Sequence, residues 1–260
     1  MQIFDNLRLT PYHLFFLFVS LLYSFNVKAK DLPSPVNKVP IYSQQLVIEE
    51  WTAGLDEPWG LSFISDGVVL VTEKKGNLLV ITRDSKKKVI GVPSVTNKGQ
   101  GGLLDVALDS NYSLNGWVYL SFSDMDKNNP EKSMTKIVRG KLSYSSKSIT
   151  WENEEVLFQA NPKDYMNTGF HFGSRIAFDN NDHLYFGIGD RGVMDMAQSI
   201  NVPNGKIHRI KTDGSIPEGN PFVNTFNAYP SIFTYVNRNP QVILVNPYSN
   251  VIWQTEHGPK

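Results

Sequence analysis

Three distant stretches of the chain carry polar side chains that could act on one ligand. Gln100 offers an amide, His171 an imidazole, and the neighbours Arg238 and Asn239 a guanidinium and a second amide. A neutral imidazole can accept a proton, whereas a guanidinium and amides bind an anion or a polarised carbonyl. In one cavity they would form a site for an anionic or carbonyl-bearing ligand. Taken alone, His171 is better interpreted as a loop histidine whose hydrogen bonds are satisfied.

Four hairpins must bring these residues together. Each hairpin has two apolar runs rich in β-branched and aromatic residues, separated by turn residues such as Asp66-Gly67 or Asn115-Gly116. The hairpins span residues 60–73, 102–122, 173–188 and 240–254. Beyond the N-terminal region the sequence shows no sustained 3.6-residue apolar period, so the expected fold class is all-β.

The recurrence of these hairpins predicts a β-propeller, in which each repeat forms one blade. A β-sandwich also strings hairpins together and is the alternative. Similar residues at the same point of each hairpin favour the propeller. In that fold the residues just before each first strand share one rim around the axis. We therefore expect Gln100, His171, Arg238 and Asn239 to meet at one funnel mouth.

Composition excludes several classes of protein. The 260 residues contain 25 Lys and Arg against 25 Asp and Glu, so no excess charge draws the chain to nucleic acid. The absence of cysteine rules out disulfides, thiolate metal sites and a cysteine nucleophile.

The N-terminus has the features of an export signal. Arg8 precedes an apolar run at 14–23, and Val27 and Ala29 fit a cleavage site. We interpret 1–29 as a signal peptide and the proline-rich stretch 30–45 as a linker. This predicts a periplasmic or secreted protein with no stable membrane association after cleavage. An uncleaved anchor is the alternative, for which the run is short.

Six short motifs follow one another along the rest of the chain. They are Pro58-Trp59-Gly60-Leu61-Ser62-Phe63, Gly99-Gln100-Gly101-Gly102-Leu103-Leu104-Asp105-Val106-Ala107-Leu108, His171-Phe172-Gly173-Ser174-Arg175, Gly189-Asp190-Arg191-Gly192, Arg238-Asn239-Pro240-Gln241 and Glu256-His257-Gly258-Pro259. In this order they resemble the soluble PQQ-dependent sugar dehydrogenases, the glucose/sorbosone (aldose) dehydrogenase family. The resemblance implies a six-bladed propeller of the quinoprotein glucose dehydrogenase type, of which 46–260 would form about four blades.

The same resemblance implies a reaction and its cofactors. Family members oxidise an aldose sugar to its lactone by hydride transfer to PQQ, with Ca²⁺ beneath the quinone and an external electron acceptor. By this resemblance His171 is the general base and Arg238 stabilises charge on the quinone oxygen. Gln100 and Asn239 match positions that bind cofactor or substrate. Gly258 and Pro259 match a loop whose backbone oxygens face the calcium; a plain turn is the alternative reading.

Two departures from the family pattern bear on activity. Val236 and Asn237 stand where relatives have Gly-His, and Val242 stands where they have glycine. A β-branched residue would strain the backbone wherever that glycine adopts a positive φ.

The second departure is at the end of the chain. Relatives continue past the Gly-Pro with an acidic calcium ligand and further blades, whose basic residues hold the PQQ carboxylates. We therefore expect a C-terminally truncated family member that could be inactive. The alternatives are a non-catalytic propeller fragment that binds a sugar or a partner protein, and a calcium-dependent lactonase-type propeller, which would use carboxylates such as Asp105 and Asp190.

Overall fold

The computed structural model describes residues 49–258. The predicted signal peptide 1–29, the linker 30–45 and Pro259 lie outside this range. Contacts divide the chain into Met1–Glu49 and Glu50–Lys260, and every described strand belongs to the second unit. None of the described helices is long or apolar enough to cross a membrane.

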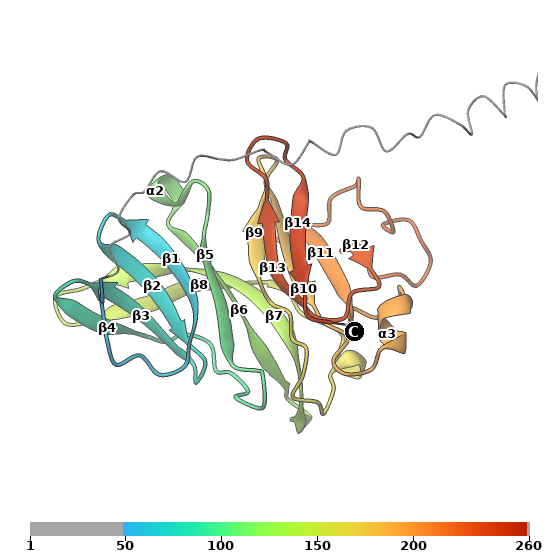
Figure 1. Cartoon of the computed structure of the whole chain (residues 1–260), viewed down its shortest axis with the longest axis horizontal. Coiled ribbons are helices and arrows are strands. Elements are labelled where there is room, and N and C mark those ends of the chain that lie inside the picture. Colours follow the sequence, from blue (N-terminus) through green and yellow to red (C-terminus); the bar gives the residue numbers. More distant parts are fainter. Residues whose placement is uncertain (1–48, 259–260) are drawn as a thin grey trace, which may run out of the picture. The chain divides into compact units, whose positions relative to one another are not determined.

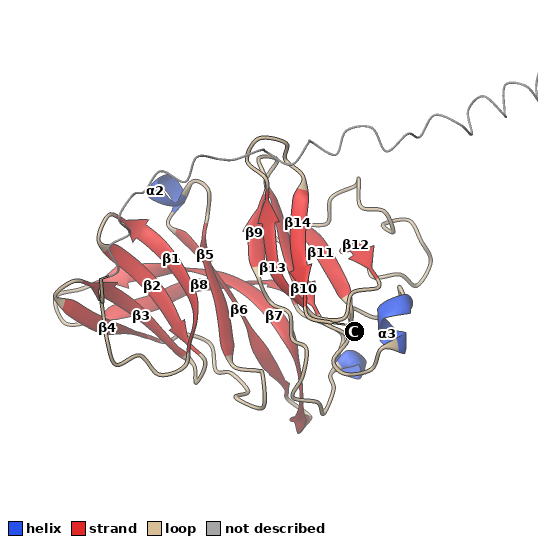
Figure 2. Ribbon diagram, in the orientation of Figure 1, coloured by secondary structure: helices blue, strands red, loops and turns tan. Residues whose placement is uncertain are grey.

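Antiparallel strands account for almost all regular structure in this unit (Figures 1 and 2). Blade 1 contains β1–β4, blade 2 contains β5–β8 and blade 3 contains β9–β12, while a fourth hairpin contains β13 and β14. The strands are β1 (Pro58–Ser65), β2 (Val68–Glu73), β3 (Asn77–Thr82), β4 (Ser85–Ile90), β5 (Leu103–Leu108), β6 (Trp117–Asp126), β7 (Asn129–Tyr144), β8 (Ile149–Phe158), β9 (Ile176–Phe178), β10 (His183–Ile188), β11 (Lys206–Lys211), β12 (Ile232–Tyr235), β13 (Pro240–Val245) and β14 (Ile252–Glu256).

The first strands of successive units lie beside one another. β1 contacts β5, β5 contacts β9, and β9 contacts β13. Within each blade the later strands follow in order outward, except that the ends of β4 and β8 also pair in parallel through Val89 and Ile149. Sheets arranged around their first strands form a β-propeller rather than a β-sandwich, as the repeat predicts.

Apolar clusters join each blade to the next. Leu70 and Leu78 of blade 1 pack with Leu120 and Val138 of blade 2. Phe158 of blade 2 belongs to a cluster that reaches blade 3, and a smaller cluster joins blade 3 to the fourth hairpin. Because each of these clusters spans two sheets, packing between blades fixes the loops at the ends of the first strands relative to one another.

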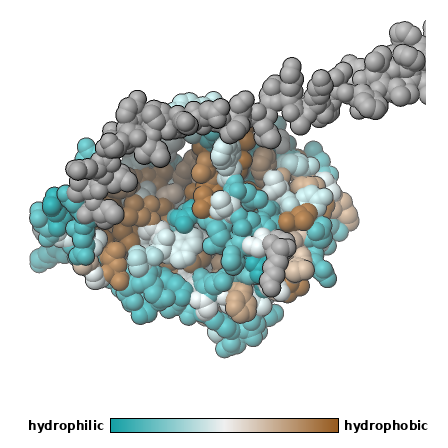
Figure 3. Space-filling view, in the orientation of Figure 1, coloured by the Kyte–Doolittle hydropathy of each residue, from teal (hydrophilic) through white to brown (hydrophobic). Residues whose placement is uncertain are grey.

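Two surfaces of these sheets expose large apolar side chains. They lie on β1, at Leu61 and Phe63, and on the fourth hairpin, at Leu244 and Trp253. Apolar surface is visible near these strands in Figure 3.

The predicted hairpins are all present, with two corrections. The connection from β5 to β6 is not a tight turn, because it contains the short helix α2 (Tyr112–Asn115), which ends at Gly116 in a left-handed conformation. The third hairpin does not begin at residue 173, since β9 starts only at Ile176. Gly173 and Ser174 have positive φ values of 62° and 87°, which a strand cannot accommodate.

Candidate active site

A pocket of about 470 Å³ opens where the loops before β5, β9 and β13 come together. Two of the predicted residues, Gln100 and Asn239, line it. The remaining lining residues come from the same loops, from the turn after β2, from the inner strands and from the segment after β14: Trp59, Lys74, Gly99, Leu104, Phe172, Gly173, Gln241 and His257.

Gln100 ties two of these loops together. Its backbone N–H donates to the carbonyl of Gly169 at 2.7 Å, and its Oε1 accepts the backbone N–H of His171 at 2.8 Å. The loops touch so closely that a Cβ on Gly99 would lie 2.4 Å from the Gly169 oxygen. Glycine at 99, with φ of 59°, is therefore what allows Gln100 to hold the histidine loop.

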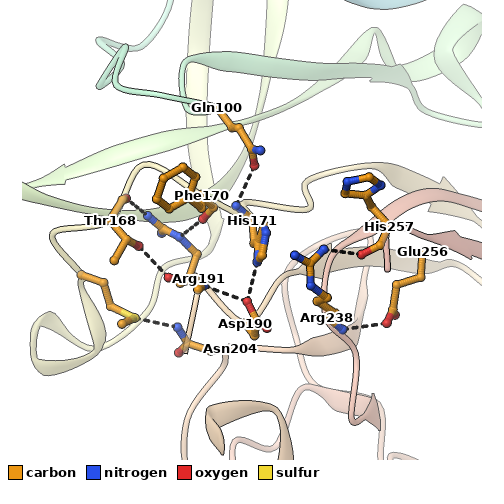
Figure 4. Close-up of polar contacts among 12 residues, drawn as sticks. Gln100, Thr168, Phe170, His171, Asp190, Arg191, Asn204, Arg238, Glu256 and His257 are labelled. Atoms are coloured by element: carbon orange, nitrogen blue, oxygen red, sulfur yellow. Dashed lines mark hydrogen bonds and ion pairs between the residues drawn. The ribbon is translucent and has the colours of Figure 1, made fainter. Parts of the chain in front are cut away.

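His171 is oriented by a buried carboxylate (Figure 4). Its Nδ1 lies 2.6 Å from Oδ1 of Asp190, a residue that is only 1 % exposed. An ionised carboxylate can only accept, so Nδ1 carries the proton and donates it. The lone pair of the neutral imidazole is then on Nε2, the nitrogen that can take a proton from a ligand.

The backbone at His171 is strained. Its φ is 53°, a conformation that non-glycine residues rarely adopt. Strain of this kind costs about 1–3 kcal/mol and persists only where the surroundings impose it. Here two hydrogen bonds that His171 donates impose it, one from its backbone to Gln100 and one from its ring to Asp190.

Arg238 lies next to the histidine. A Cβ on Gly189 would approach both the His171 backbone oxygen and the Arg238 carbonyl, at 2.4 and 2.9 Å, so only glycine fits between the two loops. The Arg238 carbonyl accepts the N–H of Asp190 at 2.7 Å. Its guanidinium donates to the carbonyl of His257 at 2.6 Å, and its N–H donates to the Glu256 carboxylate at 2.8 Å.

Arg191 holds the 168–172 loop, which carries His171, through hydrogen bonds to its backbone. Its fully buried guanidinium donates to the carbonyls of Thr168 and Phe170 at 2.6 and 2.8 Å (Figure 4). It also donates to the carbonyl of Ser133 at 3.0 Å. It also lies 3.6 Å from the centre of the Phe172 ring. Burial lowers the pKa of Arg191 to about 9. The side chain thus joins β7 to the 168–172 loop, which carries His171.

Asn239 has the least satisfied side chain of the pocket. The residue is 3 % exposed, and its Oδ1 is buried without a hydrogen-bond partner among the described residues. A buried acceptor of this kind costs free energy unless a ligand or water donates to it.

The part of the chain that the structure describes contains no group of three or more His, Cys, Asp or Glu residues that could hold a metal ion. Gly258, predicted to face calcium, lies against Arg238: a Cβ on Gly258 would be 2.9 Å from the guanidinium Nη1. The positively charged side chain of Arg238 therefore occupies the space beside this loop. Pro259 lies outside the described residues.

The structure places Gln100 and Asn239 in the pocket lining, and His171 and Arg238 beside it. The four predicted residues are therefore neighbours, but only two of them line the pocket. The sequence did not predict the pairing of Asp190 with His171 or the presence of Lys74 and His257 in the pocket. Asp190 was visible only as part of a motif, 19 residues from its histidine. The turn that carries Lys74 belongs to the first blade, and no local pattern indicates that it folds back over the second.

A family model and a curated protein match most of this chain. The family model described as glucose/sorbosone dehydrogenase matches residues 55–260. The aldose sugar dehydrogenase YliI of Escherichia coli (strain K12) is 34 % identical over 209 residues, which cover 79 % of this chain and 55 % of that protein. The chain thus spans about half the length of this curated relative.

Solved structures share the fold. A crystal structure of a glucose dehydrogenase superposes with a TM-score of 0.75 at 33 % identity, covering 81 % of this chain and 60 % of that one. The PQQ-bound form of an aldose sugar dehydrogenase from Streptomyces coelicolor gives a TM-score of 0.69 at 28 % identity, covering 82 % and 60 %.

Proposed function

The chain belongs to the glucose/sorbosone dehydrogenase family, and we propose that it carries the catalytic residues of a PQQ-dependent aldose dehydrogenase. The proposed reaction oxidises the anomeric carbon of a sugar to a lactone. The observation that carries this proposal is the hydrogen bond of His171 to buried Asp190, beside a pocket that Gln100 and Asn239 line.

The pocket fits PQQ by the chemistry of its donors. Its described lining residues offer the Lys74 ammonium, the His257 imidazole and three amides, and none of them is a carboxylate. The buried Asn239 Oδ1 lacks a partner among the described residues and would accept a donor from a bound molecule. PQQ, when bound, would supply the acceptor for the hydride.

His171 has the geometry of the proton acceptor. As the C1–H bond breaks and its electron pair leaves with the hydride, the C1 hydroxyl must lose its proton and the C–O bond becomes a carbonyl. His171 would take this proton on Nε2, and Asp190 would stabilise the imidazolium through Nδ1. Gln100 holds the histidine backbone, and Arg238 holds a positive charge beside it, suited to an acceptor oxygen that gains negative charge.

The described residues support a calcium site less well than they support PQQ binding. The described residues alone do not fit the ion, because the His257 carbonyl is bonded to Arg238 and no acidic cluster is nearby. No step of the proposed chemistry passes through calcium, and its binding by Gly258 and Pro259 stays a prediction.

The lactonase alternative is less well supported by this geometry. It requires free carboxylates, but Asp105 is bonded to Arg175 at 2.6 Å and to the backbone N–H of Ile176 at 2.8 Å. Asp190 is bonded to His171 and to Gly192. We prefer the dehydrogenase.

Export to the periplasm or the exterior is also part of the proposal and rests on the sequence of residues 1–29. Fractionation of cells that express the chain, with N-terminal sequencing of the product, would test it.

His171→Ala tests the proposed role of the base. Because the chain spans about half of YliI, the assay uses the chain itself and a chimera in which the remainder of YliI follows it. With PQQ and glucose, we expect the chimera to reduce a redox dye and His171→Ala to slow it by about 10²–10⁴-fold, the usual contribution of a general base. An unchanged rate in the variant would refute the assignment.

A further inference from the structure

Among the described residues that line the pocket, Lys74 is the only lysine or arginine, and none is Asp or Glu. The pocket is therefore positively charged, in a chain whose Lys and Arg together equal its Asp and Glu. A lysine on the lining, with no carboxylate among the described lining residues, favours an anionic ligand.

The backbone of Lys74 is fixed at the contact between blades 1 and 2. Its N–H donates to the carbonyl of Glu57 at 3.1 Å, and its carbonyl accepts the N–H of Leu103, the first residue of β5, at 2.9 Å. A Cβ on Gly102 would lie 2.1 Å from the Lys74 oxygen, so glycine at 102 is what permits the approach. The lysine is thus held at the pocket by the same kind of close contact that holds His171.

The Lys74 ammonium can donate hydrogen bonds to a ligand in addition to its ion pair. Its ion-pair partner is Glu57, at 3.3 Å, and the Glu57 side chain is 52 % exposed. Because half of the Glu57 side chain is in solvent, a pair of this length contributes little to stability. An ammonium has three N–H donors, so a carboxylate in the pocket can bind Lys74 at little cost to Glu57.

We propose that Lys74 binds a carboxylate of PQQ and so anchors the cofactor on the blade 1 side of the pocket. This proposal rests on the proposed function, because PQQ, a tricarboxylate, is the ligand that the family membership suggests. It assigns to the first blade a contact that the sequence motifs did not indicate. On the side of the fourth hairpin, the polar residues that line the pocket are Asn239 and Gln241.

Lys75 provides a matched control. It is the next residue in the same turn and pairs with Asp56 at 2.7 Å, but it does not line the pocket. Lys74→Met and Lys75→Met remove the same charge from the same turn. Only the first removes it from the pocket.

The measurement is the affinity of the purified chain for PQQ, by equilibrium dialysis with the absorbance of PQQ. We expect Lys74→Met to weaken binding by about 10-fold or more, as loss of a charge-assisted hydrogen bond does. Lys75→Met should stay within about twofold of the unchanged chain, and Lys74→Arg should retain most of the affinity. The trimethyl ester of PQQ should bind the unchanged chain and Lys74→Met equally.

The outcomes separate this inference from the function on which it rests. If PQQ binds the unchanged chain and Lys74→Met binds it equally well, the Lys74 contact is refuted while the cofactor assignment stands. Equal losses in Lys74→Met and Lys75→Met would refute the contact as well, because the effect would then be one of general charge. If the unchanged chain does not bind PQQ, both proposals fail.

Discussion

Asp190 acts on the site through its hydrogen bond to His171, and both residues lie beside the pocket rather than in its described lining. Its Oδ1 accepts both the imidazole Nδ1–H and the Gly192 N–H, and its own N–H donates to Arg238. One buried carboxylate therefore fixes the tautomer of the imidazole, and its backbone joins the loop of His171 to that of Arg238. This arrangement makes Asp190 a positioning residue, and its removal should affect the proton transfer more than the binding of sugar.

Asp190→Asn should lower kcat of the chimera by about 10²-fold or more and leave KM for glucose within a few fold, because the amide can hold the imidazole in the wrong tautomer. Asp179→Asn is the matched control, since Asp179 pairs with His183 at 2.9 Å in the same Nδ1 geometry but away from this pocket. Steady-state kinetics with both variants checks this. A rise in KM alone, or an equal loss of kcat in the control, would contradict the positioning role.

Val236, which stands where relatives have glycine, strains the connection between β12 and the pocket loop. It follows β12 and precedes the pocket loop, and its φ is 73°. This confirms the expectation that a valine in place of glycine would be strained here. Val242, the other valine, is not strained in this way: it lies within β13 opposite Thr255, and its φ is not positive.

The two valines predict opposite effects of the same substitution. Val236→Gly should raise the free energy of unfolding by about 1 kcal/mol, since the relief of strain exceeds the entropic cost of glycine. Val242→Gly should lower it by about 1 kcal/mol, because glycine weakens a strand. Thermal or urea unfolding of both variants measures the difference. Destabilisation by Val236→Gly would show that the loop does not store strain.

The hairpins beside the axis were predictable from sequence, whereas the outer strands were not. β2 and β10 are continuous apolar runs, since both of their faces are buried between blades. β4, by contrast, has the sequence SKKKVI and exposes three lysines, so its composition indicates no strand. It forms because β3 offers an edge, and its Val89 reaches the core. Only tertiary context supplies that information.

At the site, too, part of the arrangement depends on tertiary contacts that the sequence does not indicate. Equivalent positions in a repeat predicted that Gln100, His171, Arg238 and Asn239 would meet. The positive φ at His171, which turns its ring toward Asp190, depends on contacts between loops 71 and 19 residues apart in sequence. No pattern in one hairpin can indicate it.

His208 links the stability of the whole unit to pH. It lies fully buried in β11 against the rings of Phe158 and Phe186, whose centres are 5.1 and 5.0 Å from its own. Ser231 Oγ and the Pro203 carbonyl, both at 2.9 Å, bind its two nitrogens. Burial, with a smaller contribution from nearby Lys206, lowers the pKa of His208 from its ordinary 6.5 to about 3. Its ring therefore stays neutral at the contact between blades 2 and 3.

The low pKa of His208 predicts loss of stability in acid. As pH falls below 6.5 the unfolded chain binds a proton at this residue, whereas the folded chain does not do so until about pH 3. The free energy of unfolding should thus fall with pH across this window, by about 2–3 kcal/mol between neutral pH and pH 4.5. Urea unfolding at a series of pH values measures this slope.

Two variants show whether His208 causes the slope. His208→Leu should be less stable at neutral pH, because Ser231 and Pro203 lose their hydrogen-bond partner, but its stability should depend less on pH. His257→Leu, which changes an exposed histidine, should keep the slope of the unchanged chain. A slope that His208→Leu leaves unchanged would place the acid sensitivity elsewhere than at the contact between these two blades.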